Sequence, residues 1–446
     1  MTALARTDTS IVGRWWWTVD RWLLVAVVSI AMAGVILSLA ASPPVAERIG
    51  LDKFHFARRQ IVFIAMALMV MVCVSFLGPR GVRRIAALST LAALILMTVT
   101  LFAGNEIKGA TRWLHVGGFS LQASEFVKPG FAVLAAWLFA SRRLNDQFPG
   151  YALASGLYII VAGLLLLQPD VGMILVISSI WAVQFFIVGL PWILVAGIAS
   201  LFAAGSAAAY FAFDHVRLRV DRFLDPDGGQ GYQVGRALDA FRNGGWAGRG
   251  PGEGRVKEVL PDAHADFIFA VVGEEFGLIA CIIILGLFCF VVLRGFNNAA
   301  KDQDLFVLLA VAGLLTQFAL QALINMASTV NLMPPKGMTL PFISYGGSST
   351  LALGFGLGMV LALTRSRPSS GGMRGRGHAT LLSCWRPVVP AGMSFQRKRW
   401  PENYRRVDSD WPWSRIGAAM FSVVSWGIWR RIAFVLAGSP VKNWSL

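Results

Sequence analysis

Long apolar runs separated by short polar segments dominate the pattern of residues along the chain. A run of about 20 apolar residues is enough to cross roughly 30 Å of hydrocarbon as a helix. The sequence contains ten such runs, over residues 22–41, 60–78, 85–103, 121–140, 150–168, 171–190, 191–213, 267–293, 305–328 and 345–364. The first run is too long for the core of a signal peptide, so we expect it to be retained as a membrane span.

The short loops predict the orientation, because Lys and Arg favour the cytoplasmic side of a membrane. With the N-terminus inside, twelve basic residues fall on inner segments: Arg6, Arg14, Arg21, Arg80, Arg83, Arg84, Arg142, Arg143, Arg294, Lys301, Arg365 and Arg367. Seven fall on outer short loops: Arg48, Lys53, Arg58, Arg59, Lys108, Arg112 and Lys336. The sequence therefore predicts an all-α integral membrane protein with ten transmembrane helices, both termini cytoplasmic, and a long extracytoplasmic loop between helices 7 and 8.

The chain divides into three parts on this reading. Residues 1–21 form a cytoplasmic N-terminal segment, and residues 22–366 form the ten-span domain, with its large extracytoplasmic loop over 214–266. That loop has glycine clusters and a near-neutral balance of eight basic and nine acidic residues, so we expect ordered structure in it. The tail, 367–446, is basic and holds seven of the sixteen Trp residues. Its composition fits a membrane-surface segment or a frame-shifted end of the gene.

Composition and charge argue against a soluble protein and against a nucleic-acid-binding protein. Of the 446 residues, 56% are hydrophobic and 14% charged, against about 45–50% and about 25% in soluble proteins. The net charge of +16 is dispersed, with 28 basic and 21 acidic residues in 1–368 and 12 and 3 in 369–446, so no basic groove for nucleic acid is predicted. The four cysteines lie too far apart in sequence to suggest a disulfide framework or a metal knuckle.

Two charged residues inside the fourth span require an explanation, because a charge in a span costs about 2.5–3.5 kcal/mol on insertion scales. Glu125 and Lys128 are three residues apart, so they lie on one face of a helix and can form an ion pair. The pair is either a structural lock between helices or part of a functional site.

The segment Pro261–Glu275 ends the long loop and enters the eighth span. Asp266 lies at the predicted water boundary, where a carboxylate can stay ionised and act as a base; the alternative is a helix cap. Asp262, His264 and Asp266 alternate, and a divalent cation is a further alternative for them. Glu275 is expected to have a structural role inside the span.

The last outer loop, Asn331–Thr350, contains three prolines and a Gly-Gly pair. Irregular backbone at a membrane face persists only where it lines a polar cavity, so the loop indicates a site. Lys336 is its single cation, suited to a phosphate; the alternative is a lysine that extends to water at the interface.

Four segments resemble the SEDS family (shape, elongation, division and sporulation), and the resemblance covers about residues 15–366 in order. They are KGATRWLHVGGFSLQASEFVKPG (108–130), GYQVGRALDAFRNGGWAGRGPGEG (231–254), LPDAHADFIFAVVGEEFG (260–277) and LMPPKGMTLPFISYGGSS (332–349). The Lys-Gly of the last segment is more similar to the division member than to the elongation member. Ala265 stands where the family usually has Thr.

The resemblance implies an enzyme that polymerises lipid II into peptidoglycan glycan strands at the septum of the bacterial inner membrane. It places the catalytic base on Asp266, the supporting loop glutamate on Glu258, the loop lysine on Lys336 and the fourth-span pair on Glu125 and Lys128. Other candidates for supporting or substrate-binding roles, all in the matching segments, are Arg112, His264 and Glu275.

One carboxylate suffices for this chemistry, because pyrophosphate is already a good leaving group and needs only charge stabilisation. A divalent cation, Mg²⁺ or Mn²⁺, is a candidate cofactor. The expected partners are lipid II, a class B penicillin-binding transpeptidase and other divisome membrane proteins. A lipid II flippase and a non-catalytic divisome scaffold are the alternative functions, since ten spans with intramembrane charges also describe a transporter.

Overall fold

The computed structural model describes residues 10–107, 110–116, 119–189, 231–260, 262–334 and 337–365, with scattered residues between 197 and 221. Most of the predicted seventh span, Lys336 and the tail beyond residue 365 lie outside the described residues. The first half of the chain forms α1 (Ile11–Thr18), α2 (Arg21–Arg48), α3 (His55–Ser75), α4 (Pro79–Ala103), β1 (Asn105–Ile107), β2 (Ala110–Val116), β3 (Phe119–Leu121), α5 (Ala123–Leu144), α6 (Gly150–Leu167) and α7 (Val171–Val188). The second half forms α10 (Gly231–Gly244), α11 (Val256–Val259), α12 (Ile268–Glu275), α13 (Gly277–Ala300), α14 (Leu305–Thr329) and α15 (Gly347–Leu363).

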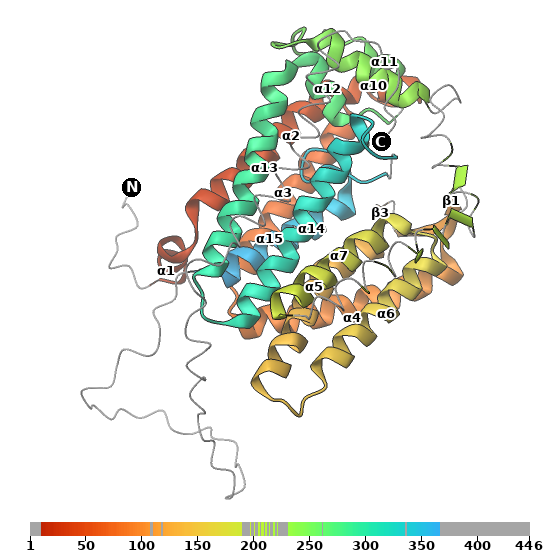
Figure 1. Cartoon of the computed structure of the whole chain (residues 1–446). Helices are drawn as coiled ribbons and strands as arrows, with labels where there is room; N and C mark the ends of the chain where they lie inside the picture. The colour runs from red at the N-terminus through yellow and green to blue at the C-terminus, as the bar shows by residue number, and fades with distance from the viewer. Residues whose placement is uncertain are drawn as a thin grey trace, which may run out of the picture.

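The architecture is mostly helical, as the apolar runs predict (Figure 1). Eight helices in the described part of the chain are long and apolar enough to cross a membrane: α2 to α7, α13 and α14. The ninth matching run, α15, is shorter at 17 residues and almost entirely buried. The full count of ten stays a prediction.

The expectation of an all-α protein is wrong between α4 and α5. Three short antiparallel strands form a sheet there in the order β1-β2-β3, with Leu114 opposite Leu121 in the second pair of strands. Hydropathy over a span-length window does not detect strands of three to seven residues. Aromatic and β-branched residues such as Trp113 and Val116 are the local signal that favours them.

The predicted continuous span over 267–293 is also wrong, because the chain breaks there into α12 and α13. Gly277 separates the two helices with φ of 74°, a left-handed conformation that suits glycine. A Cβ at this position would lie 2.4 Å from both the Gly248 nitrogen and the Trp246 oxygen. The break therefore lets the loop after α10 pack directly on the helix backbone.

Close glycine contacts hold α15 against α3 inside the bundle. A Cβ at Gly354 would lie 2.5 Å from the Ala67 oxygen, and one at Gly358 would lie 2.8 Å from the Met71 oxygen. Small residues four apart let two helix backbones approach, which is a common way to pack helices in membranes.

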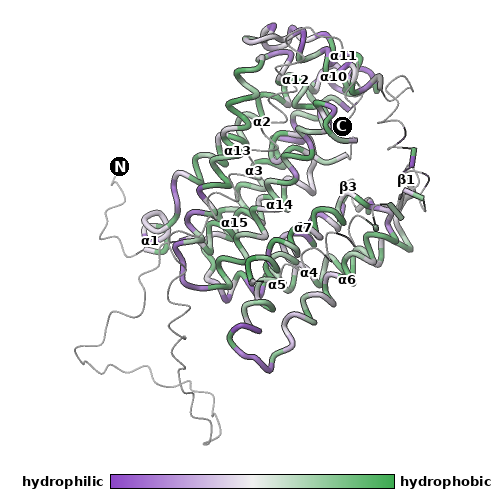
Figure 2. The backbone as a smooth tube through the Cα atoms, in the orientation of Figure 1, coloured by the Kyte–Doolittle hydropathy of each residue, from purple (hydrophilic) through white to green (hydrophobic). Residues whose placement is uncertain are grey.

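Side-chain contacts define two opposite ends of the bundle. At one end, Arg365 after α15 donates to Thr18 before α2 and to the carbonyl of Ser75 at the end of α3. At the other end, Arg48 of α2 donates to the carbonyl of Glu258, beside α10 to α12. Hydrophobic residues fill the helix bodies, and hydrophilic residues gather near α10–α11 and near α1 (Figure 2). Which of these two ends faces the cytoplasm stays a prediction.

Candidate active site

Asp266 lies in a run of turns, Asp262–Phe267, directly before α12. The nitrogens of Ala265 and Asp266 donate to the Asp262 carbonyl at 3.0 and 3.1 Å. Asp262 has φ of 54°, a left-handed conformation that Asp tolerates better than most residues. The cap position of α12 is Phe267, so Asp266 does not occupy the place of a helix cap. Its side chain is half-buried.

The last outer loop lies beside this turn. A Cβ on Gly337 would be 3.7 Å from Asp266 Oδ2, and the Tyr345 nitrogen donates to the His264 carbonyl at 3.0 Å. Lys336 directly precedes Gly337 in sequence, but its position lies outside the described residues. The two segments that the sequence singles out as a site are therefore neighbours.

His264 packs against two aromatic rings, at centroid distances of 4.4 Å from Phe56 and 5.5 Å from Tyr345, and these two rings also contact each other. Burial lowers the pKa of its imidazole, against a smaller opposing effect of Asp262, so the ring favours its neutral form.

The divalent-cation alternative for Asp262, His264 and Asp266 is wrong for the described residues, among which no group of three His, Cys, Asp or Glu side chains could hold a metal. Residues 262–267 form turns rather than an extended strand, so alternate side chains do not share a face.

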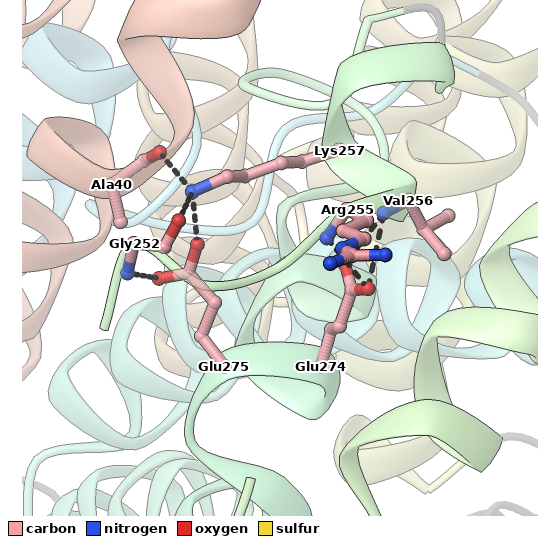
Figure 3. Close-up of polar contacts among 7 residues, drawn as sticks. All are labelled: Ala40, Gly252, Arg255, Val256, Lys257, Glu274 and Glu275. Atoms are coloured by element: carbon pink, nitrogen blue, oxygen red, sulfur yellow. Dashed lines mark hydrogen bonds and ion pairs between the residues drawn. The ribbon is translucent and has the colours of Figure 1, made fainter. Parts of the chain in front are cut away.

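Two consecutive glutamates at the end of α12 hold the short helix α11 (Figure 3). Glu274 accepts hydrogen bonds from the backbone nitrogens of Arg255 and Val256, both at 3.0 Å, at the start of α11. Glu275 lies 2.5 Å from Lys257 Nζ and also accepts from the Gly252 nitrogen at 3.1 Å. The exposed fractions of the Lys257 and Glu275 side chains are 6% and 0%.

The Lys257 ammonium has three partners, because it also donates to the carbonyls of Gly252 and Ala40, at 3.0 and 3.3 Å. We call the contacts of Glu274 and Glu275 with residues 252–257 the α11–α12 latch. The latch fixes both flanks of the segment that carries Asp266. The neighbouring Glu258 has an exposed side chain, and its backbone carbonyl accepts from Arg48.

The ion pair expected in the fourth span is present on α5. Lys128 Nζ lies 2.8 Å from Glu125 Oε2, and both side chains are buried. Lys128 also donates to Gln321 Oε1 on α14 at 3.2 Å. Gln321 Nε2 in turn donates to Thr339 at 3.1 Å and to Ser349 at 2.8 Å. A buried polar network therefore connects the ion pair to the last outer loop, and its role in function stays a prediction.

Arg112 contacts residues 168–170 and none of the other predicted site residues in these hydrogen bonds and ion pairs. It extends from β2 to the turn between α6 and α7, where it donates to the carbonyls of Gln168 and Pro169 and lies 3.8 Å from Asp170. These contacts join the sheet to two helices, and a substrate-binding role for Arg112 remains only a prediction.

A cavity of about 1140 Å³ lies at the opposite end of the bundle. Asp20, Arg294, Lys301 and Arg365 are among its lining residues, and none of the predicted site residues lines it. The chemistry expected of Asp266 thus belongs to the end formed by α10 to α12 and the last outer loop.

Sequence reasoning missed Lys257, Gln321 and Asn325. Asn325 on α14 donates from Nδ2 to the Asp266 carbonyl at 3.0 Å and to the Met338 carbonyl at 2.7 Å. The available signal was the spacing of Gln321 and Asn325, four apart in an apolar run and hence on one helix face.

The fold and site together define a polytopic membrane protein with a carboxylate beside a loop at one end of the helix bundle. Residues 21–369 match the FtsW/RodA/SpoVE family, described as cell cycle proteins. The chain belongs to this family, which confirms the resemblance to SEDS proteins. It is therefore a multi-pass bacterial membrane protein.

Named relatives extend over most of the chain. The protein is 48% identical over 374 residues to the probable peptidoglycan glycosyltransferase FtsW of Caulobacter vibrioides, covering 84% of this chain and 96% of that one. It is 32% identical over 358 residues to the protein of the same name from Escherichia coli O6:H1, covering 77% and 85%. These names agree with the predicted similarity to the division member.

Solved structures show the same fold. A chain in a peptidoglycan synthase complex, described as coordinating polymerization and crosslinking, matches with a TM-score of 0.66 at 30% identity, covering 78% of this chain and 97% of that one. The rod shape determining protein RodA of Thermus thermophilus matches with a TM-score of 0.58 at 29% identity and the same coverage.

Proposed function

We propose that this protein polymerises lipid II into peptidoglycan glycan strands at the division septum of the bacterial inner membrane. The class of enzyme is that of the curated relatives, which are named peptidoglycan glycosyltransferases. The finer proposal is that Asp266 is the general base.

The observation that carries the proposal is the placement of Asp266. It is a half-buried carboxylate at the end of the bundle, and the last outer loop approaches it at Gly337, the residue that follows Lys336 in sequence. A general base must lie within reach of the proton that it accepts, and a half-buried side chain at the end of the bundle can meet a substrate hydroxyl.

The proposed reaction is a displacement at the anomeric carbon of the donor. A sugar hydroxyl of the acceptor attacks the anomeric carbon of the donor, and its proton passes to the Asp266 carboxylate. The bond from that carbon to the undecaprenyl pyrophosphate oxygen breaks, and the pyrophosphate leaves with the electron pair. Lys336 is the proposed cation for the developing negative charge, since an ammonium there acts as a point charge on phosphate.

A penicillin-binding transpeptidase is the proposed partner. Its support is the similarity to a chain from a complex that coordinates polymerization and crosslinking. Such a partner would crosslink the strands that this protein makes.

Asp266→Asn tests the base directly. Asn is nearly isosteric and cannot accept the proton, so we expect a loss of about 10²- to 10⁴-fold in the rate of lipid II polymerisation. Asp262→Asn is the matched control, because it makes the same chemical change four residues away at an exposed side chain. It should stay within about threefold of the parent rate, since Asn also tolerates φ of 54°.

The assay is strand formation on a gel by the purified protein with its transpeptidase partner. A wild-type rate from Asp266→Asn would end the proposal of a base at this residue. Labelled lipid II that crosses liposomes without polymer would support a flippase instead. Complex formation without either activity would support a scaffold.

A further inference from the structure

Asn325 is buried at the point where the Asp266 turn meets the last outer loop, with 1% of its surface exposed. It lies on α14, the helix that packs against α5, α7, α13 and α15. Its side-chain oxygen has no hydrogen-bond partner among the described residues, so the two hydrogen bonds of its side-chain nitrogen are the polar contacts that hold this buried amide.

The side-chain amide of Asn325 has two N–H groups, and both are used on backbone carbonyls of the site. One bonds to the Asp266 oxygen at 3.0 Å and the other to the Met338 oxygen at 2.7 Å. Because both partners can only accept, the orientation of the amide is determined, and a flipped amide would place oxygen against oxygen. Asn325 therefore bridges two segments that are more than 70 residues apart in sequence.

The bridge and the turn hold different polar groups of the Asp266 backbone. The Asp266 nitrogen donates to Asp262 at 3.1 Å, and its carbonyl accepts from Asn325, so both polar groups of its backbone are held. The other half of the bridge holds Met338, two residues after Lys336 in sequence.

Gln321, one turn earlier on α14, holds the next residue of the same loop. It donates to Thr339 and to Ser349, and it accepts from Lys128. Gln321 and Asn325, one turn apart on the same face of α14, thus hold the neighbouring loop residues Thr339 and Met338. Asn325 also holds Asp266, and Gln321 does not contact it through any of these hydrogen bonds.

We propose that Asn325 is a positioning residue that sets the distance between the Asp266 carboxylate and the last outer loop at Met338. This inference rests on the proposed function, in which the carboxylate takes the acceptor proton and the loop holds the donor pyrophosphate. Proton transfer and departure of the pyrophosphate occur on substrates held by these two segments, so their separation determines the reacting geometry. A displacement of about 1 Å costs about 100-fold in rate.

The test replaces Asn325 with Leu, which has a similar volume and no donor. The matched control is Gln184→Met, because Gln184 on α7 is equally buried and donates in the same way to two carbonyls, those of Ala132 and Leu309, at 2.6 and 3.0 Å. Both changes remove two hydrogen bonds between helices or loops, but only the first touches the residue of the base.

We expect Asn325→Leu to lower kcat for lipid II polymerisation by about 10- to 100-fold with little change in KM, and Gln184→Met to stay within about threefold of the parent. Equal losses in the two variants would show a merely structural role and overturn the inference. Asn325→Asp, which keeps the shape and loses at least one donor, serves as a second variant if the Leu protein does not insert. A wild-type rate in either inserted variant at Asn325 would overturn it as well.

A double-mutant cycle separates this inference from the proposed function. If Asn325 acts through Asp266, adding Asn325→Leu to Asp266→Asn should lower the residual rate less than threefold. A further 10- to 100-fold loss would mean that Asn325 acts independently of the base. If Asp266→Asn itself has the wild-type rate, the proposed base fails; if that variant is slow and Asn325→Leu is not, the positioning inference alone fails.

Discussion

The α11–α12 latch gives a prediction whose size follows from burial. Lys257→Met keeps the aliphatic stem and removes the ammonium, so the Glu275 carboxylate, with 0% of its side chain exposed, keeps only the Gly252 N–H as a partner among the contacts in Figure 3. Leaving one member of a buried ion pair alone costs about 3–5 kcal/mol. We therefore expect Lys257→Met to lower the free energy of unfolding by that amount.

Removing the second charge should restore most of the loss. In Lys257→Met/Glu275→Gln no charge is buried, and the Gln carbonyl can still accept from Gly252. Replacing both members of a buried pair is often close to neutral. The double variant should thus be more stable than Lys257→Met alone, with a coupling free energy of about 2 kcal/mol or more.

The chain offers an exposed pair as the control. Lys53 Nζ lies 3.1 Å from Glu47 Oε1, and the exposed fractions of the two side chains are 67% and 53%. Such pairs contribute about 1 kcal/mol or less, so Lys53→Met should have a small effect. The measurement is SDS-induced unfolding in mixed micelles, followed by the fluorescence of the sixteen Trp residues. Equal losses from Lys257→Met and Lys53→Met, or a double variant no more stable than the single, would refute the reasoning.

Three further changes test other parts of the structure. Gly277→Ala should destabilise the protein by about 1–2 kcal/mol from its left-handed φ alone, with an added clash, whereas Gly286→Ala, whose Cβ meets nothing within 4 Å, should be neutral in the same unfolding assay. Lys336→Met should strongly reduce lipid II polymerisation with normal membrane insertion; unchanged turnover would mean that the lysine only extends to water. Truncation after Pro368 should leave insertion and polymerisation intact, since every motif precedes it; loss of the shortened protein from membrane fractions would contradict this.

Hydropathy predicts most of the helices because a span must be apolar over its whole length and satisfy its own backbone hydrogen bonds. The same averaging hides the break at Gly277, since the residues on both sides are apolar. What permits the break is contact with the distant loop: the Leu278 nitrogen donates to Gly245, and the Gly250 nitrogen donates to Glu275. Those partners lie in a segment whose path no local pattern specifies.

The part of the candidate site that could be predicted from the sequence consists of charged residues that stand within apolar runs. Glu125 and Lys128 attract attention because of their cost in a span, and they do form a pair. Lys257 could not be identified in this way, because a lysine in a long loop of mixed charge resembles a solvated residue. Only its burial against α2 and α12 distinguishes it from the exposed lysines.

Two separate devices hold the segment around Asp266, and their arrangement has a consequence for catalysis. The latch attaches α12 to α11, and Asn325 attaches the Asp266 carbonyl to the last outer loop. The contacts of both groups are made with the backbone of Asp266 or with neighbouring residues, not with the Asp266 carboxylate. They therefore fix the backbone without changing the charge of this side chain. Since the backbone around Asp266 is held before the substrate binds, less conformational entropy has to be lost when the catalytic groups are positioned for the reaction. Variants in either device should consequently lower turnover more than they weaken lipid II binding, because the substrate contacts themselves are unchanged.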